Sequence, residues 1–166
     1  MQVNVISGNI AAETSDAIIT AINSGGMWFG GIDGVIQRMA GNMFHNQAAA
    51  ETLTDGKAIV AYGRNSNIPF KNVVFVVDDL KQKLSSILYN GLVAAQKEGF
   101  EYISIPAIRT GVMLGVVEKN LTEVADEFCI ALNKFKSDFK SSMIINFVIY
   151  DNPQFKALLT DKVKSI

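Results

Sequence analysis

Cysteine and histidine are almost missing from this chain, which holds one of each, Cys129 and His45, among its 166 residues. A disulfide within the chain is impossible, and a zinc site of cysteine and histidine ligands is nearly excluded, because such sites take several of these side chains. Cys129 lies in the apolar run "FCIAL", which favours a buried structural thiol. His45 has no partner at the spacing of a metal site, so we predict no chemical role for it.

Long apolar runs and an excess of charge are missing too. No run approaches the ~20 residues that span a bilayer. The first residues, "MQVNVISGNI", have neither the basic segment nor the apolar core of a signal peptide. The net charge of −1 argues against broad electrostatic binding to nucleic acid or to an anionic membrane, although it allows a local anion site built from backbone. We therefore expect a cytoplasmic protein without membrane or nucleic-acid partners.

Apolar residues make up 49% of the chain, which is enough for a packed core. The length fits a single domain over residues 1–166, and a domain of that size buries roughly 70% of its unfolded surface. Short runs rich in β-branched residues alternate with stretches of helical periodicity. Strands are expected at 3–6, 16–22, 58–63, 72–77, 102–108 and 143–150. Helices are expected at 31–40 and in its continuation "NMFHNQAAAET", at 81–97 and 117–136, and in a short segment from Pro153.

This alternation predicts an α/β fold with a largely parallel sheet and helices on both of its faces. In such sheets, ligands bind outside the carboxyl ends of the strands. Two loops expected at strand ends are rich in glycine, 25–34 and 110–115. Glycine lets the backbone approach a ligand closely, and successive amides in such a loop can hold an anion. Tight packing alone would also explain one such loop, and its pattern does not decide between the two interpretations.

The nucleotide motifs that carry a known geometry are not found. "GGIDGV" has the wrong spacing for G-x-G-x-x-G, and no G-x-x-x-x-G-K-[ST] occurs, which argues against a Rossmann dinucleotide site and a P-loop. Asp33 stands inside the first loop, where a carboxylate beside an anion is repelled. It could act as a general base on water or simply favour the helix N-terminus. Asn23, at the end of a strand, could bind a sugar hydroxyl or satisfy loose backbone.

Two longer motifs resemble those of a known family. "SGNIAAETSDAIITAINSGGMWFGGIDGVIQRMAG" and "PAIRTGVMLG" are similar, in order and spacing, to the paired motifs of the macrodomain, the ADP-ribose-binding module. The family runs G-D-I-T, V-D-A-I-V-N-A-A-N, a glycine cluster and G-x-D-G-x-I-H-x-A-A-G, then P-A-I-x-T-G-V-Y-G. The resemblance covers nearly the whole chain. It implies a three-layer α/β/α fold around a mixed, mostly parallel sheet, and no metal or other cofactor.

The resemblance also implies a site for ADP-ribose. Asn23 and Asp33 match the residues that the hydrolytic class places beside the distal ribose, and Tyr150 matches an aromatic that packs on adenine. The remaining ligand-binding residues that it implies are Asn9, Ile10, Ala21, Gly30, Gly31, Ile32, Gly34, Val35, Thr110, Gly111, Val112 and Met113.

Several positions depart from the family pattern. Asn9 replaces an aspartate that accepts a hydrogen bond from the adenine amine, so it leaves base recognition open. Gln37 replaces a histidine, and Met113 with the following leucine replaces an aromatic-glycine pair. Trp28 and Phe29 occupy positions where the family often has glycine, and either cover the distal ribose or pack on the domain. Arg109 is expected to be a solvated surface residue or to bind a further phosphate.

Three functions follow from this resemblance. The first is a metal-independent hydrolase, in which Asn23 positions the ribose and Asp33 aligns water to release a protein side chain, an acetate or a phosphate. The aspartate pattern favours removal of ADP-ribose from proteins. The second is a module that binds ADP-ribose without turnover, and the third is a diverged scaffold that binds another nucleotide or a protein. In each case we expect a monomer, and ADP-ribose or an ADP-ribosylated substrate is the partner in the first two.

Overall fold

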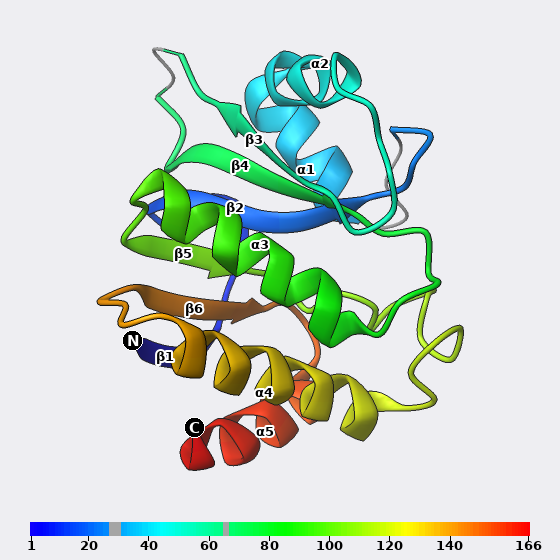
Figure 1. Ribbon diagram of the computed structural model, residues 1–166, viewed down its shortest axis with the longest axis vertical. Helices are drawn as coiled ribbons and strands as arrows, with labels where there is room; N and C mark the ends of the chain where they lie inside the picture. The colour runs from blue at the N-terminus through cyan, green and yellow to red at the C-terminus, as the bar shows by residue number, and fades with distance from the viewer. Residues whose placement is uncertain (27–30, 65–66) are drawn as a thin grey trace.

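The computed structural model describes residues 1–26, 31–64 and 67–166, and its centre is a six-stranded sheet of order β1-β6-β5-β2-β4-β3 (Figure 1). All neighbouring strands pair in parallel except β3, which is antiparallel to β4. This mixed, mostly parallel sheet is the one that the sequence predicts. The strands are β1 (Gln2–Ser7), β2 (Ser15–Ile22), β3 (Ala58–Tyr62), β4 (Phe70–Val77), β5 (Tyr102–Ile105) and β6 (Ile144–Ile149).

The helices differ from the expected ones mainly at their starts. The stretch expected to continue from residue 31 is interrupted at Gly41, whose φ of 62° is left-handed and ends the first helix. Gly99 caps a helix as predicted, with a φ of 77°. The helices are α1 (Gly31–Ala40), α2 (Met43–Ala49), α3 (Leu84–Glu98), α4 (Leu121–Asp138) and α5 (Pro153–Lys162), with short 3₁₀ helices η1 (Ile10–Ala12) and η2 (Val163–Ser165).

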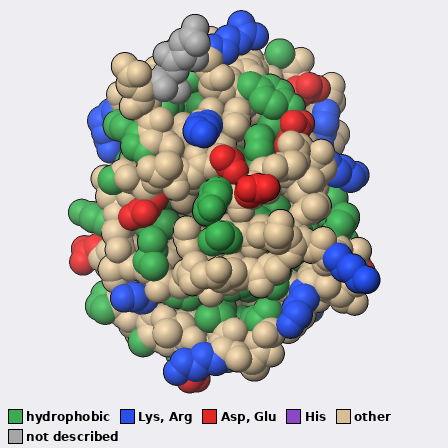
Figure 2. All heavy atoms as spheres, turned by 90° about the vertical axis from the view of Figure 1, so that its left-hand side faces the viewer, with side chains coloured by type: hydrophobic (Ala, Val, Ile, Leu, Met, Phe, Trp, Pro, Cys, Tyr) green, Lys and Arg blue, Asp and Glu red, His purple; other side chains and the backbone are tan. Residues whose placement is uncertain are grey.

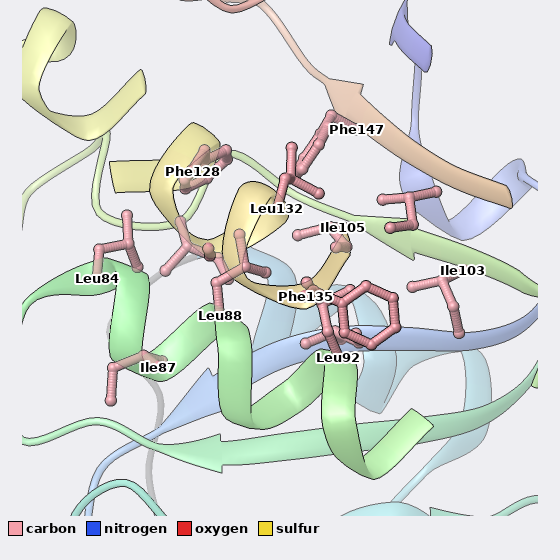
Figure 3. Close-up of a cluster of buried hydrophobic side chains, with 14 of the residues drawn as sticks. Leu84, Ile87, Leu88, Leu92, Ile103, Ile105, Phe128, Leu132, Phe135 and Phe147 are labelled. Atoms are coloured by element: carbon pink, nitrogen blue, oxygen red, sulfur yellow. The ribbon is translucent and has the colours of Figure 1, made fainter. Parts of the chain in front are cut away.

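Each face of the sheet has its own hydrophobic cluster, because successive side chains along a strand point to opposite faces. In β4, Val74 and Val76 pack in the cluster beneath α3 and α4, whereas Val73 and Phe75 belong to the cluster beneath α1 and α2. Figure 3 shows the larger cluster, in which side chains of α3 and α4 meet those of β5 and β6. The three-layer α/β/α architecture is therefore confirmed.

Close contact between helix and sheet depends on Gly91 in α3. A Cβ at this position would lie 2.6 Å from Cγ2 of Ile19 in β2, closer than real carbon atoms approach. Glycine therefore lets α3 lie directly on the sheet. No helix in the described parts of the chain is long and apolar enough to cross a membrane.

The parallel strands all end at one edge of the sheet, the right-hand side in Figure 1. At the opposite edge, where they begin, acidic and basic side chains are interspersed on the surface (Figure 2). The segments that lead from β2, β4 and β5 into α1, α3 and α4 lie at the edge where the strands end. A ligand site is expected at this edge.

Candidate functional site

A cavity of about 540 Å³ opens at the edge where the parallel strands end. Its volume lies within the range of small-molecule and cofactor sites. Segments that follow β1, β4, β5 and β6 line it together with one face of α1. The structure thus gathers most of the residues that the sequence assigned to ligand binding: Asn9, Ile10, Gly31, Ile32, Val35, Thr110, Gly111, Val112, Met113 and Tyr150.

One part of the lining is aromatic and apolar. Tyr150 follows β6 directly and is 77% exposed, and Val148 and Ile10 line the same cavity. A planar group of a ligand can stack on an exposed aromatic ring of this kind. Beside Ile10, Asn9 accepts the amide of Ala11 through Oδ1 at 3.0 Å and so caps η1.

The loop after β5 presents backbone amides. Thr110 closes the turn by donating through Oγ1 to the carbonyl of Ala107 at 2.7 Å. The next three amides, those of Gly111, Val112 and Met113, donate to no acceptor in the described part of the chain, and all three residues line the cavity. Successive unpaired amides of this kind form a concave site for an anion.

Helix α1 contributes a second anion-binding element. Gly31, Ile32, Val35 and Arg38 line the cavity at the spacing of a single helix face, so the first turn of the helix borders it. Unpaired amides and the positive end of the dipole at a helix N-terminus favour negative charge. Sequence reasoning missed Arg38, an exposed cation whose position seven residues after Gly31 on the same face could have identified it.

Asp33 does not line this cavity. Its position on α1 turns it away from the lining face, and Oδ1 contacts Nε2 of His45 in α2. The imidazole packs on Phe75 with ring centroids 5.2 Å apart, and its buried Nδ1 has no hydrogen-bond partner among the described residues. The sequence pattern gave His45 no partner at the spacing of a metal site, and it did not reveal this contact with Asp33. The chain turns at Gly41 and brings α2 back beside Asp33, which residue spacing does not show.

Arg109 is neither a surface residue nor free for phosphate, so both expectations for it are wrong. Its side chain is 2% exposed and donates to Asp78 at 2.7 and 3.0 Å, to Glu118 at 2.8 and 3.1 Å, and to the carbonyl of Gln82. Burial acts to lower its pKa, but hydrogen bonds to the two carboxylates outweigh burial and raise it. The guanidinium stays charged and holds the cavity loop in place.

Arg109, Asp78 and Glu118 form a buried ion cluster, and both of its carboxylates also accept backbone amides. Asp78 Oδ1 also accepts the amide of Leu80, and Glu118 Oε2 accepts that of Leu84 at the start of α3. Leu80 and Arg109 both have positive φ, 59° and 63°, a conformation that L-residues rarely adopt. The ion cluster therefore stabilises two strained turns that border the cavity. Within residues 1–26, 31–64 and 67–166, no three His, Cys, Asp or Glu side chains gather to hold a metal ion.

The other predicted site residues that the structure describes are not among those that line the cavity. Ala21 is buried within β2, and Gly34 lies on α1 outside the residues that line the cavity. Asn23 follows β2 and is half-buried, and its backbone carbonyl accepts the amide of Gly26 at 2.9 Å. Gly30, Trp28 and Phe29 fall outside the described residues.

The chain is similar in sequence to a family model and to curated proteins. A family model described as Macro domain matches residues 19–122. An O-acetyl-ADP-ribose deacetylase from Citrobacter rodentium is 30% identical over an alignment 178 positions long, with 97% of each chain covered. One from Escherichia fergusonii is 31% identical over 127 residues, covering 67% of this chain and 69% of the relative.

Solved structures show the same fold. A Trypanosoma brucei macrodomain in complex with ADP-ribose superposes with a TM-score of 0.78 at 21% identity, covering 97% of this chain and 69% of that one. An Oceanobacillus iheyensis macrodomain with ADP gives a TM-score of 0.71 at 23% identity, covering 97% and 89%.

Proposed function

The chain belongs to the Macro domain family, as its two motifs predicted, and from this we propose that it binds ADP-ribose derivatives and hydrolyses a group from the distal ribose. The observation that carries the binding proposal is the set of unpaired amides at Gly111, Val112 and Met113, which borders the same cavity as the first turn of α1. Two amide-rich elements around one space suit a pyrophosphate, whose charge is spread over several oxygens.

The other features of the cavity suit the rest of the ligand. Tyr150 offers an exposed ring on which a base can stack, next to the apolar side chains of Ile10 and Val148. Arg38 adds a positive charge on the face of α1 that borders the cavity. The net charge of the chain is −1, so we attribute attraction of the anion to these local groups.

For the reaction, we propose that Asn23 orients the distal ribose and that Asp33 aligns or activates the attacking water. The proposal needs no metal ion. The names of the deacetylase relatives favour an ester of ADP-ribose as substrate, ahead of the ADP-ribosylated protein that the aspartate pattern favours. Asp33 is 22% exposed in its contact with His45, so water has access to the carboxylate.

A module that binds without turnover is the second candidate. It is favoured by the position of Asp33, which contacts His45 and does not line the cavity. One pair of measurements separates the two candidates. Calorimetry with ADP-ribose tests binding, and chromatography of O-acetyl-ADP-ribose and of a mono-ADP-ribosylated protein tests release. Binding with release supports the hydrolase, binding alone supports the module, and no binding contradicts both.

Gly111→Val is expected to weaken ADP-ribose binding by about tenfold or more, because a branched side chain would stand where the backbone must approach the ligand. A Cβ at Gly111 meets no atom of the described residues within 4 Å, and φ is not positive, so the fold should accept the substitution. Calorimetry measures the affinity, and the urea midpoint checks the fold.

Gly111→Ala is the graded control for this prediction and should lose less affinity than the valine variant, since it adds a single methyl group. Unchanged affinity in the valine variant, with an unchanged urea midpoint, would mean that the loop after β5 does not contact the pyrophosphate.

A further inference from the structure

We propose that the cavity recognises the edge of the base with a hydrogen-bond donor, the amide nitrogen of Asn9, and therefore accepts a 6-oxopurine at least as well as adenine. This inference rests on the proposed function, because it takes the ligand to be a purine nucleoside diphosphate with its phosphates at the amide-rich loop. It specifies which base the site admits.

The orientation of the Asn9 amide is set by the backbone. Oδ1 accepts the amide of Ala11 at 3.0 Å, and only an oxygen can accept there, so Nδ2 is the other end of the group. Nδ2 donates to no acceptor in the described part of the chain. Asn9 is exposed and lines the cavity, so a ligand can reach this unpaired donor.

We place the base at the end of the cavity that Asn9 lines, for two reasons. Ile10, Val148 and Tyr150 supply the apolar and aromatic contacts that a base needs, and Ile10 directly follows Asn9. The unpaired amides that suit phosphate lie in the loop that follows β5. A nucleotide with its phosphates at that loop and its ring on Tyr150 brings the edge of the base to Asn9.

No carboxylate is available to bind an exocyclic amine. Asp78 is the one carboxylate among the cavity-lining residues that the structure describes, and both of its oxygens accept from Arg109. The 6-amino group of adenine is a donor and cannot pair with the donor of Asn9, whereas the 6-carbonyl of hypoxanthine accepts from it. Adenine can accept from Nδ2 only through a ring nitrogen, which leaves its 6-amino group without an acceptor among the described cavity-lining side chains, so the unpaired donor of Asn9 favours the oxo base.

The experiment measures the ratio of two dissociation constants, for ADP-ribose and for its hypoxanthine counterpart, by calorimetry. The wild type is expected to bind the hypoxanthine ligand equally or more tightly. Asn9→Asp replaces the donor with an acceptor, keeps the cap on Ala11, and should shift the ratio toward adenine by about tenfold. Repulsion between the new charge and the pyrophosphate affects both ligands alike and cancels in the ratio.

Asn152→Asp is the matched control. Asn152 also caps a helix, accepting the amide of Phe155 at 3.1 Å, and it stands two residues after Tyr150 without lining the cavity. The ratio of the two dissociation constants for Asn152→Asp should equal that of the wild type. A wild type that prefers adenine by more than about threefold, or a ratio that Asn9→Asp leaves unchanged, overturns the inference. If neither ligand binds, the proposed function fails, and this inference fails with it.

Discussion

Asp33→Ala is expected to reduce release from O-acetyl-ADP-ribose by about 10² or more, the contribution of a positioned general base, while ADP-ribose affinity changes little. Binding should survive because Asp33 lies outside the residues that line the cavity. The fold should survive because the side chain is partly exposed and, in the described part of the chain, its hydrogen-bonding partner is His45. Initial rates at saturating substrate, together with calorimetry, measure the two effects separately.

Asp126→Ala is the control for loss of a carboxylate. Asp126 is half exposed on α4, pairs with Lys162 and lies outside the residues that line the cavity, so its removal should leave the rate unchanged. Release by the Asp33 variant at the wild-type rate would remove Asp33 from the mechanism. The carboxylate would then serve only the N-terminal turn of α1 and its contact with His45.

Arg109→Ala is expected to lower the free energy of unfolding by about 3 to 5 kcal/mol, because it leaves buried carboxylates without their counter-charge. Asp78 and Glu118 are 1% and 4% exposed in this cluster, so water cannot replace the guanidinium. A loss of this size is a large fraction of the total stability of a domain. Urea unfolding followed by circular dichroism measures it.

Two further variants keep this prediction testable if the alanine variant does not fold. Arg109→Lys keeps the charge with fewer directed donors, so it should fold with a smaller loss of stability. Lys162→Ala breaks an exposed ion pair with Asp126 and should leave the urea midpoint nearly unchanged. If Arg109→Ala unfolds at the same urea concentration as the wild type, the buried cluster does not stabilise the turns around the cavity.

Local patterns in the chain predicted much of the fold. The run 16–22 was expected to be a strand buried on both faces, and β2 (Ser15–Ile22) has this burial. Gly99 was expected to cap a helix and does so in the left-handed conformation. Helix boundaries were less accurate. The helix expected from 117 begins at Leu121, where the Asn120 side chain accepts the amide of Glu123, because a single capping hydrogen bond decides the start.

The sequence by itself determined the layered α/β fold, because apolar periodicity acts over short stretches of chain. Its resemblance to the macrodomain motifs identified the family and most of the residues that line the cavity. Only the tertiary structure decided what the charged side chains do. The partners of Arg109 lie 31 and 9 residues away, and Asp33 meets His45 across a turn between two helices. Such pairs form when separate elements pack and exclude water. The energy of a charge depends on those neighbours, which the order of residues does not reveal.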